Sequence, residues 1–150
     1  MRLRIPSLGL DAAIEYVTTD SEGRMDVPQE VENVAWYSPG ARPGAPGNAV
    51  FSGHFDDYKQ EPAVFWRLTE LHVGEVVTVV DEFGAERRFE VIGTEIYRYD
   101  QAPLLRIFGP DQTANLNLIT CNGIWDSNAW NYDKRLVVYT RAFDEGVVRP

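Results

Sequence analysis

The chain has 150 residues, of which 44% are hydrophobic and 25% are charged, and its formal net charge is −9. We expect residues 1–150 to form a single domain that buries roughly two thirds of its unfolded surface. The negative charge argues against a nucleic-acid-binding protein, because phosphate neutralisation requires clustered lysine and arginine. A single cysteine excludes an internal disulfide, so the cysteine count does not indicate a cellular compartment.

Short runs of alternating or β-branched residues, separated by turn residues, extend along the whole chain. The Pro- and Gly-rich segment 39–47 is expected to be a loop, and residues 82–85 have the composition of a hairpin turn. A short helix is expected around residues 62–71, because four apolar side chains recur there on one face. The predicted strands lie near residues 2–6, 12–17, 48–53, 75–82, 87–99, 115–121 and 135–143. Many short strands in one domain favour a closed or partly closed β-barrel.

The only cysteine, Cys121, ends a predicted strand, and the break signal Asn122-Gly123 follows it. A thiol in this place, facing a loop, is suited to chemistry, and its thiolate is the reactive form. His54 and Arg135 are candidates for the cationic and orienting groups, because each lies where a predicted strand meets a polar or aromatic loop. The alternative is an inert core cysteine, since free cysteines are often buried.

These three residues lie in motifs that resemble those of the sortases, which are cysteine transpeptidases of Gram-positive and related cell surfaces. Residues 117–121, Asn-Leu-Ile-Thr-Cys, are similar to the family motif Thr-Leu-x-Thr-Cys and differ only at Asn117. The apolar run 47–54 ends in histidine as the family's histidine strand does. Arg135-Leu136-Val137-Val138 matches the basic residue that opens the family's last strand.

The resemblance extends over nearly the whole chain. Residues 4–14 are similar to the family's opening strand, and residues 65–75 match its Phe-x-x-Leu-x-x-Leu-x-x-Gly-Asp stretch with Glu75 in place of Asp. Residues 25–28 and 34–37, with the Pro-Gly loop, resemble the actinobacterial-type subclasses E and F. The resemblance implies an all-β fold, namely the closed eight-stranded sortase-type barrel with one or two short helices.

The resemblance also implies an activity, which is cleavage of a Leu-Pro-x-Thr-Gly-like sorting signal through a thioester and transfer to an amine. Cys121 is then the nucleophile, His54 the general acid and base, and Arg135 the group that holds the substrate carbonyl or oxyanion. Asp56 either orients His54 or is a solvated loop carboxylate. The residues expected to bind substrate are Thr120, Leu118, Leu105, Ile107 and Trp125. The alternatives are a cysteine peptidase that hydrolyses the same signal and a non-catalytic β-barrel binding module.

The implied partners are secreted proteins with a C-terminal sorting signal and an amine from a cell-wall precursor or a pilin. No cofactor or metal is expected, because two histidines and one cysteine show no metal-ligand spacing and the acidic residues 81, 82 and 86 lack the ligand density for calcium. No window approaches 18 apolar residues. By the resemblance, the native enzyme is an extracytoplasmic, membrane-anchored monomer, and this chain is its soluble catalytic domain without the amino-terminal anchor.

Overall fold

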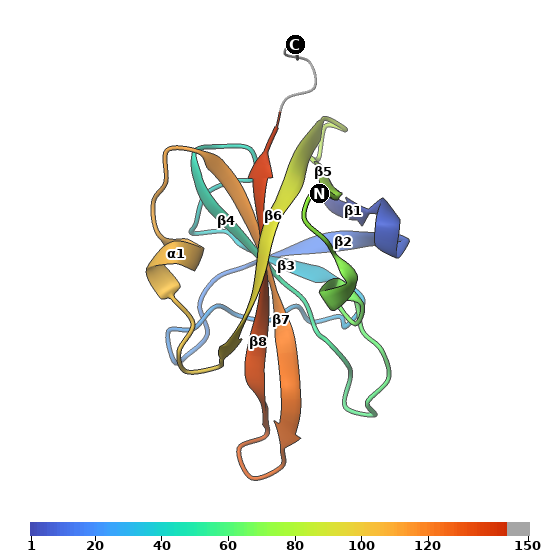
Figure 1. Cartoon of the computed structure of the whole chain (residues 1–150), viewed down its shortest axis with the longest axis vertical. Helices are drawn as coiled ribbons and strands as arrows, with labels where there is room; N and C mark the ends of the chain where they lie inside the picture. Colours follow the sequence, from blue (N-terminus) through green and yellow to red (C-terminus); the bar gives the residue numbers. More distant parts are fainter. Residues whose placement is uncertain (144–150) are drawn as a thin grey trace.

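Eight strands form a closed barrel in the computed structural model, which describes residues 1–143. The strands are neighbours in the order β1-β2-β3-β4-β7-β8-β6-β5 (Figure 1). Their bounds are β1 Arg2–Ile5, β2 Leu10–Val17, β3 Val34–Tyr37, β4 Gly47–Ser52, β5 Val76–Val80, β6 Glu86–Arg98, β7 Ala114–Asp126 and β8 Asn131–Ala142. The helical segments are the 3-10 turns η1 (Pro6–Leu8) and η2 (Leu68–Glu70) and the short helix α1 (Leu104–Phe108). The predicted eight-stranded all-β barrel is confirmed.

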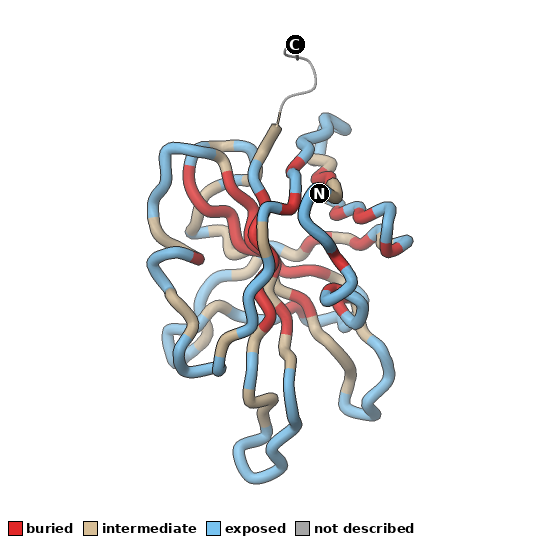
Figure 2. The backbone as a smooth tube through the Cα atoms, in the orientation of Figure 1, coloured by how far each residue is buried: buried red, intermediate tan, exposed pale blue. Residues whose placement is uncertain are grey.

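The barrel interior is filled by side chains that alternate inward along the strands. On β7, Leu118 points into this interior, and its neighbour Ile119 lies on the outer face. The bulkiest fully buried side chains are Phe51, Phe65 and Phe89. Figure 2 shows the buried residues gathered at the centre of the molecule, where the strands cross. A closed barrel leaves no unpaired sheet edge, and all eight strands contribute side chains to this one core.

A second, smaller cluster lies on the outer face of β4, β7 and β8. Val50, Val137 and Tyr139 pack there against Ile107 of α1. Helix α1 contacts β4 and lies beside the sheet in Figure 1. The connection between β6 and β7 therefore forms a wall along this outer face.

The helix predicted around residues 62–71 is wrong. Only Leu68–Glu70 is helical, as the 3-10 turn η2. The backbone N–H of Phe65 donates to the His54 carbonyl at 3.0 Å, so this segment is tied to the loop after β4. The predicted apolar face is correct, because Phe65, Leu68 and Leu71 are buried in the core.

Two further expectations about the strands need correction. The sequence patterns do not predict β3, a four-residue strand that pairs with the strands before and after it in the chain, β2 and β4. The break expected at Asn122-Gly123 is a bulge, because β7 continues to Asp126 and pairs with β8 in a hairpin. Strand β8 accordingly begins at Asn131, before Arg135. The predicted hairpin turn at residues 82–85, between β5 and β6, is confirmed.

Candidate active site

Three neighbouring strands place Cys121 directly opposite Arg135 and put His54 just beyond the end of β4. We call these three positions the row. Strand β4 is parallel to β7, with Ser52 opposite Ile119, so His54 and Cys121 each lie two residues beyond this pair. The Thr120 hydroxyl donates to the Gly53 carbonyl at 2.8 Å and continues the contact past the last strand pair. On the other side, Arg135 of antiparallel β8 lies directly opposite Cys121.

Cys121 and Arg135 lie on the outer face of the sheet, beyond the cluster that α1 covers. Cys121 alternates with inward-pointing Thr120 and therefore shares its face with Ile119. Its side chain is half-buried.

Three effects act on the thiol. Burial raises the pKa of Cys121 above its ordinary value, the positive charge of Arg135 lowers it, and the negative charge of Asp56 raises it. Burial is the largest of the three, and the net direction is upward. The thiol form therefore predominates at neutral pH, and Arg135 is the nearby cation that favours the reactive thiolate.

The Arg135 guanidinium is held by the β7–β8 hairpin. It donates to the carbonyl oxygens of Tyr132 at 3.0 Å and Lys134 at 2.8 Å, and to the Asn131 side chain at 2.7 Å. The guanidinium carbon also lies 6.0 Å from the centre of the Tyr99 ring. These contacts place a permanent charge with directional donors beside the thiol.

His54 is half-buried between the loop after β4 and the loop that precedes β3. Its Nε2 lies 3.4 Å from the Pro28 carbonyl oxygen. That loop is held by Glu15, whose carboxylate accepts hydrogen bonds from the N–H groups of Gln29 at 2.9 Å and Glu30 at 3.1 Å. Burial opposes the charge of Glu15, but these hydrogen bonds and the nearby His54 hold the pKa of its carboxyl below the usual value. The histidine is thus placed by a loop that is itself fixed to β2.

Asp56 was expected either to orient His54 or to be solvated, and the structure gives it another partner. Its carboxylate accepts a hydrogen bond from the Tyr132 hydroxyl, and this bond links the loop after His54 to β8. The neighbouring Asp57 accepts from the backbone N–H groups of Lys59 and Glu61 and shapes its own loop. Within residues 1–143, the link from Asp56 therefore runs to Tyr132 and not to His54.

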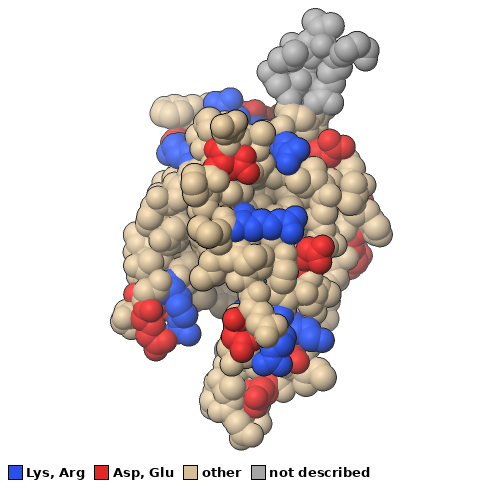
Figure 3. All heavy atoms as spheres, turned by 60° about the vertical axis from the view of Figure 1, so that its left-hand side comes forward, with Lys and Arg blue, Asp and Glu red and all other residues tan. Residues whose placement is uncertain are grey.

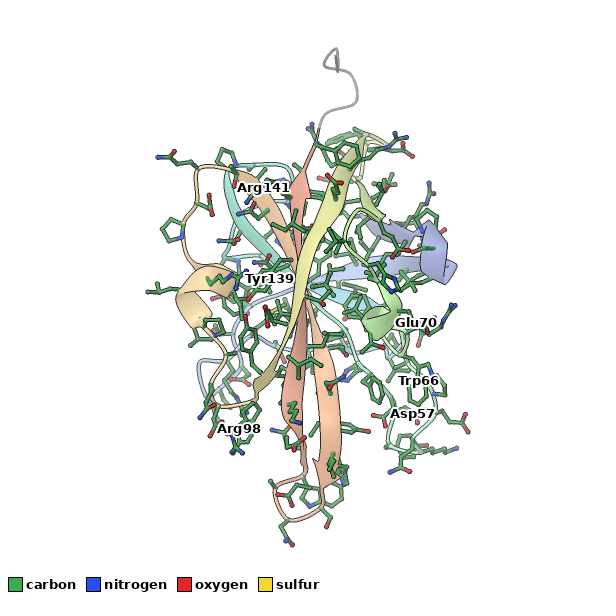
Figure 4. The ribbon with its side chains drawn as sticks, in the orientation of Figure 1. Asp57, Trp66, Glu70, Arg98, Tyr139 and Arg141 are labelled. Carbon is green, nitrogen blue, oxygen red and sulfur yellow. The ribbon has the colours of Figure 1, made fainter. Side chains whose placement is uncertain are left out.

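Aromatic rings form a continuous row beside Cys121. Phe55 stacks on Trp66 at 4.6 Å between ring centres, and its edge meets Tyr132 at 5.6 Å. Trp125 contacts both Tyr132 and Trp130. Figure 4 shows Trp66 and Asp57 on the opposite side of the β7–β8 hairpin from α1. Phe55 and Trp66 were not predicted to belong to the site, although the first of them directly follows His54.

The residues expected to bind substrate differ in their exposure. Leu105 is 83% exposed on α1 and Trp125 is 40% exposed on the hairpin, so both can reach a ligand. Leu118 and Ile107 are buried in the two hydrophobic clusters, where they pack against other core side chains. Thr120 is also buried, and its hydroxyl is used by the Gly53 carbonyl.

The carboxylates considered for calcium already have protein partners. Asp81 accepts from the backbone N–H groups of Phe83 and Ala85, and Glu82 pairs with Arg42 at 3.1 Å. Across residues 1–143, no group of three or more His, Cys, Asp or Glu side chains gathers in a way that could hold a metal ion. Over the same residues, no helix has the length and apolar character needed to cross a membrane.

The fold and the site define a class of closed eight-stranded β-barrels that carry a free cysteine directly opposite an arginine. A sortase-domain family model matches residues 3–142, and the chain therefore belongs to the sortase family. It is a sortase-type transpeptidase.

Solved sortase structures have the same fold. A lid mutant of sortase A from Corynebacterium diphtheriae is 20% identical with a TM-score of 0.72, and the match covers 99% of this chain and 70% of that one. Sortase C from Clostridium perfringens SM101 is 18% identical with a TM-score of 0.69, covering 95% and 68%. Sortase C-1 from Actinomyces oris is 22% identical with a TM-score of 0.70, covering 95% and 72%. No curated protein sequence matches this chain significantly.

Proposed function

We propose that Cys121, His54 and Arg135 are the catalytic residues of this transpeptidase and that its donor is a protein with a Leu-Pro-x-Thr-Gly-like sorting signal. The observation that carries the proposal is that Cys121 of β7 lies directly opposite Arg135 of β8, while His54 follows β4 two residues past the Ser52–Ile119 pair. A nucleophile, a group able to transfer protons and a fixed cation are the three parts that acyl transfer through a thioester requires.

The first half of the reaction forms the acyl-enzyme. The Cys121 thiolate attacks the carbonyl carbon of the scissile peptide bond, and Arg135 donates to the oxyanion that develops. The C–N bond then breaks as His54 gives a proton to the departing amine. A thioester joins the donor protein to Cys121, and the new amino terminus leaves.

The second half transfers the acyl group. An incoming amine loses a proton to His54 and attacks the thioester carbonyl. The C–S bond breaks, Cys121 is regenerated as the thiolate, and a new amide bond joins donor and acceptor. Water in place of the amine would give hydrolysis by the same residues, which is the cysteine-peptidase alternative.

The two sides of the row suggest separate places for the two substrates. The donor peptide would lie along the wall of the β6–β7 connection, where Leu105 is exposed. The acceptor amine would enter from the side of the aromatic row, which includes Trp125. The acceptor is an amine of a cell-wall precursor or a pilin, at an extracytoplasmic cell-surface location. Residues 25–28 and 34–37 support assignment to a class E- or F-like subtype.

The test is intact-mass spectrometry of the protein with a library of Leu-Pro-x-Thr-Gly-like peptides, with and without an added amine. We expect an acyl adduct on Cys121 that the amine converts into a new peptide bond, and none in Cys121→Ala. An adduct that only water releases would favour the peptidase. The absence of any adduct, together with a thiol that resists alkylation in the folded protein, would overturn the proposal and favour a binding module.

A further inference from the structure

Helix α1 cannot hold its position by itself. It has five residues and no side-chain cap at its amino end, and isolated helices of this length are unstable in water. The last carbonyl groups of any helix also lack partners within the helix. The position of α1 must therefore come from contacts with the sheet beneath it.

Two asparagine side chains supply these contacts. The Asn117 side-chain amide donates to the Ile107 carbonyl at 2.8 Å and to the Asn48 side-chain oxygen at 3.1 Å. The Asn48 amide in turn donates to the Gly109 carbonyl at 2.7 Å. Both asparagines are buried, at 1% and 6% exposure for Asn117 and Asn48 respectively. The carboxyl end of α1 is thus clamped to β7 and β4 by two buried side-chain amides.

The burial of these amides makes the clamp specific for one position of α1. A buried amide without partners costs free energy, so a shift of α1 that broke these bonds would leave buried groups unpaired on both sides. The other contacts of α1 are less directional: Ile107 packs in the outer cluster and the Arg106 guanidinium lies 4.0 Å from the Tyr139 ring centre. A polar cavity of about 110 Å³ also adjoins the clamp, so close packing alone does not fix the helix.

Position 117 is where the chain departs from the family motif, which has threonine there. A threonine hydroxyl carries one hydrogen and cannot donate to both the Ile107 carbonyl and Asn48. The clamp is therefore a property of this chain's own residues. What it holds in place is the wall, where Leu104 and Leu105 are 66% and 83% exposed. Figure 3 shows a largely uncharged face on this side of the molecule, with a basic side chain across its centre.

We propose that Asn48 and Asn117 are positioning residues that fix the β6–β7 wall and so set which donor peptides the enzyme accepts. This inference rests on the proposed function, because the wall is taken to contact the donor peptide. The two asparagines act through α1 and do not touch the reacting atoms.

The test compares Asn117→Thr with Asn115→Thr. Asn115 is a buried member of the same amide network, and its side chain bonds to Asn48 and Thr113 without touching α1. Hydrogen exchange of the amides of Ile107 and Gly109 reports the clamp, since both are bonded within α1. Peptide cleavage in the presence of an amine reports the donor site. Thermal melting confirms that each variant folds. If Asn117→Thr does not fold, Asn48→Thr replaces it, because this change removes the bond to Gly109 and the amide oxygen that accepts from Asn117.

We expect Asn117→Thr to speed exchange of these two amides at least tenfold and to raise KM for the preferred peptide about fivefold with kcat within twofold. We also expect the ratio of kcat/KM between the preferred peptide and the other peptides to fall. Asn115→Thr leaves both bonds to α1 in place, so it should change exchange, KM and this ratio much less than Asn117→Thr does. If the amides of Ile107 and Gly109 exchange faster while KM and the preference among peptides stay unchanged, the clamp has only a structural role and the inference is overturned. Unchanged exchange would overturn it as well. A wild-type chain that forms no adduct with any peptide would instead overturn the proposed function, and the specificity claim with it.

Discussion

The Tyr132 hydroxyl donates a hydrogen bond to the Asp56 carboxylate, and this bond joins the loop after His54 to strand β8. Burial and the neighbouring carboxylate raise the pKa of Tyr132 to about 12, so the phenol remains a donor at neutral pH. The same carboxylate raises the pKa of Cys121. One contact therefore both fixes the two sides of the proposed site and places a negative charge near the thiol.

Asp56→Asn is expected to increase the reactivity of Cys121 at neutral pH. Removal of the negative charge lowers the pKa of the thiol, so a larger fraction is thiolate, and we expect alkylation by iodoacetamide at pH 7 to be about two- to fivefold faster. The difference should vanish at high pH, where both proteins are thiolate. Asp57→Asn is the control, because Asp57 is its neighbour in the same loop. Equal midpoints in the pH–rate profiles of Asp56→Asn and wild type would contradict the assignment of this charge.

Arg135 is expected to act through both its charge and its donor geometry, and two substitutions separate them. Arg135→Ala removes the charge, so it should raise the pKa of Cys121 and slow alkylation at pH 7. Arg135→Lys keeps the charge and should preserve the alkylation profile. Both should reduce kcat/KM for the donor peptide, by about 100-fold or more, because a lysine cannot reproduce the directional donors at the oxyanion. Lys134→Ala, one residue away and exposed, should retain activity, and an active Arg135→Ala would remove Arg135 from the catalytic set.

The parts of the fold that were predicted correctly carry local signals. The alternation of residues 115–121 gives the strand and its buried face, and residues 82–85 give a hairpin turn because turn chemistry is local. The apolar face of residues 62–71 was also correct, but the helix was not. The N–H groups of Val64 and Phe65 donate instead to the carbonyls of Val31 and His54, and the local apolar period does not reveal these partners.

The proposed site was predictable to the extent that it lies on strand ends. Cys121, His54 and Arg135 could be selected as candidates because each falls at such a boundary, but their row depends on the order in which the barrel closes. Tyr132 and Asp56 are 76 residues apart and meet only because β7 extends past Cys121 through a bulge. The Asn117 clamp likewise requires α1 to lie over β4, and nothing local to position 117 shows this.

Glu15 is expected to stabilise the native state in a pH-dependent manner. The folded-state pKa of its carboxyl is lowered, so its contribution is present above the usual value of about 4.5 and is lost as the pH falls through the lowered value. Glu15→Gln should therefore reduce the free energy of unfolding by about 1–2 kcal/mol at pH 7 and by less at pH 3. Urea unfolding at both pH values measures this loss of stability. Glu32→Gln is the control, because Glu32 lies in the loop that Glu15 holds. An equal loss at both pH values would show that the charge of Glu15 is not the source.

Gly123 and Gly84 form a matched pair that isolates the role of the bulge after Cys121. Their φ angles are +86° and +84°, so alanine is strained by a similar amount at both. A Cβ at Gly84 meets open space, whereas at Gly123 it collides with the Asp133 carboxylate, which accepts a hydrogen bond from the Ile124 N–H at 2.7 Å. Gly84→Ala should cost about 1 kcal/mol, and Gly123→Ala should cost at least twice as much in urea unfolding. Because the bulge sets the hairpin that holds Arg135, Gly123→Ala should also reduce kcat/KM, and Gly84→Ala should not. Equal losses of stability and activity in the two variants would mean that the hairpin adjusts to the added methyl group without moving Arg135.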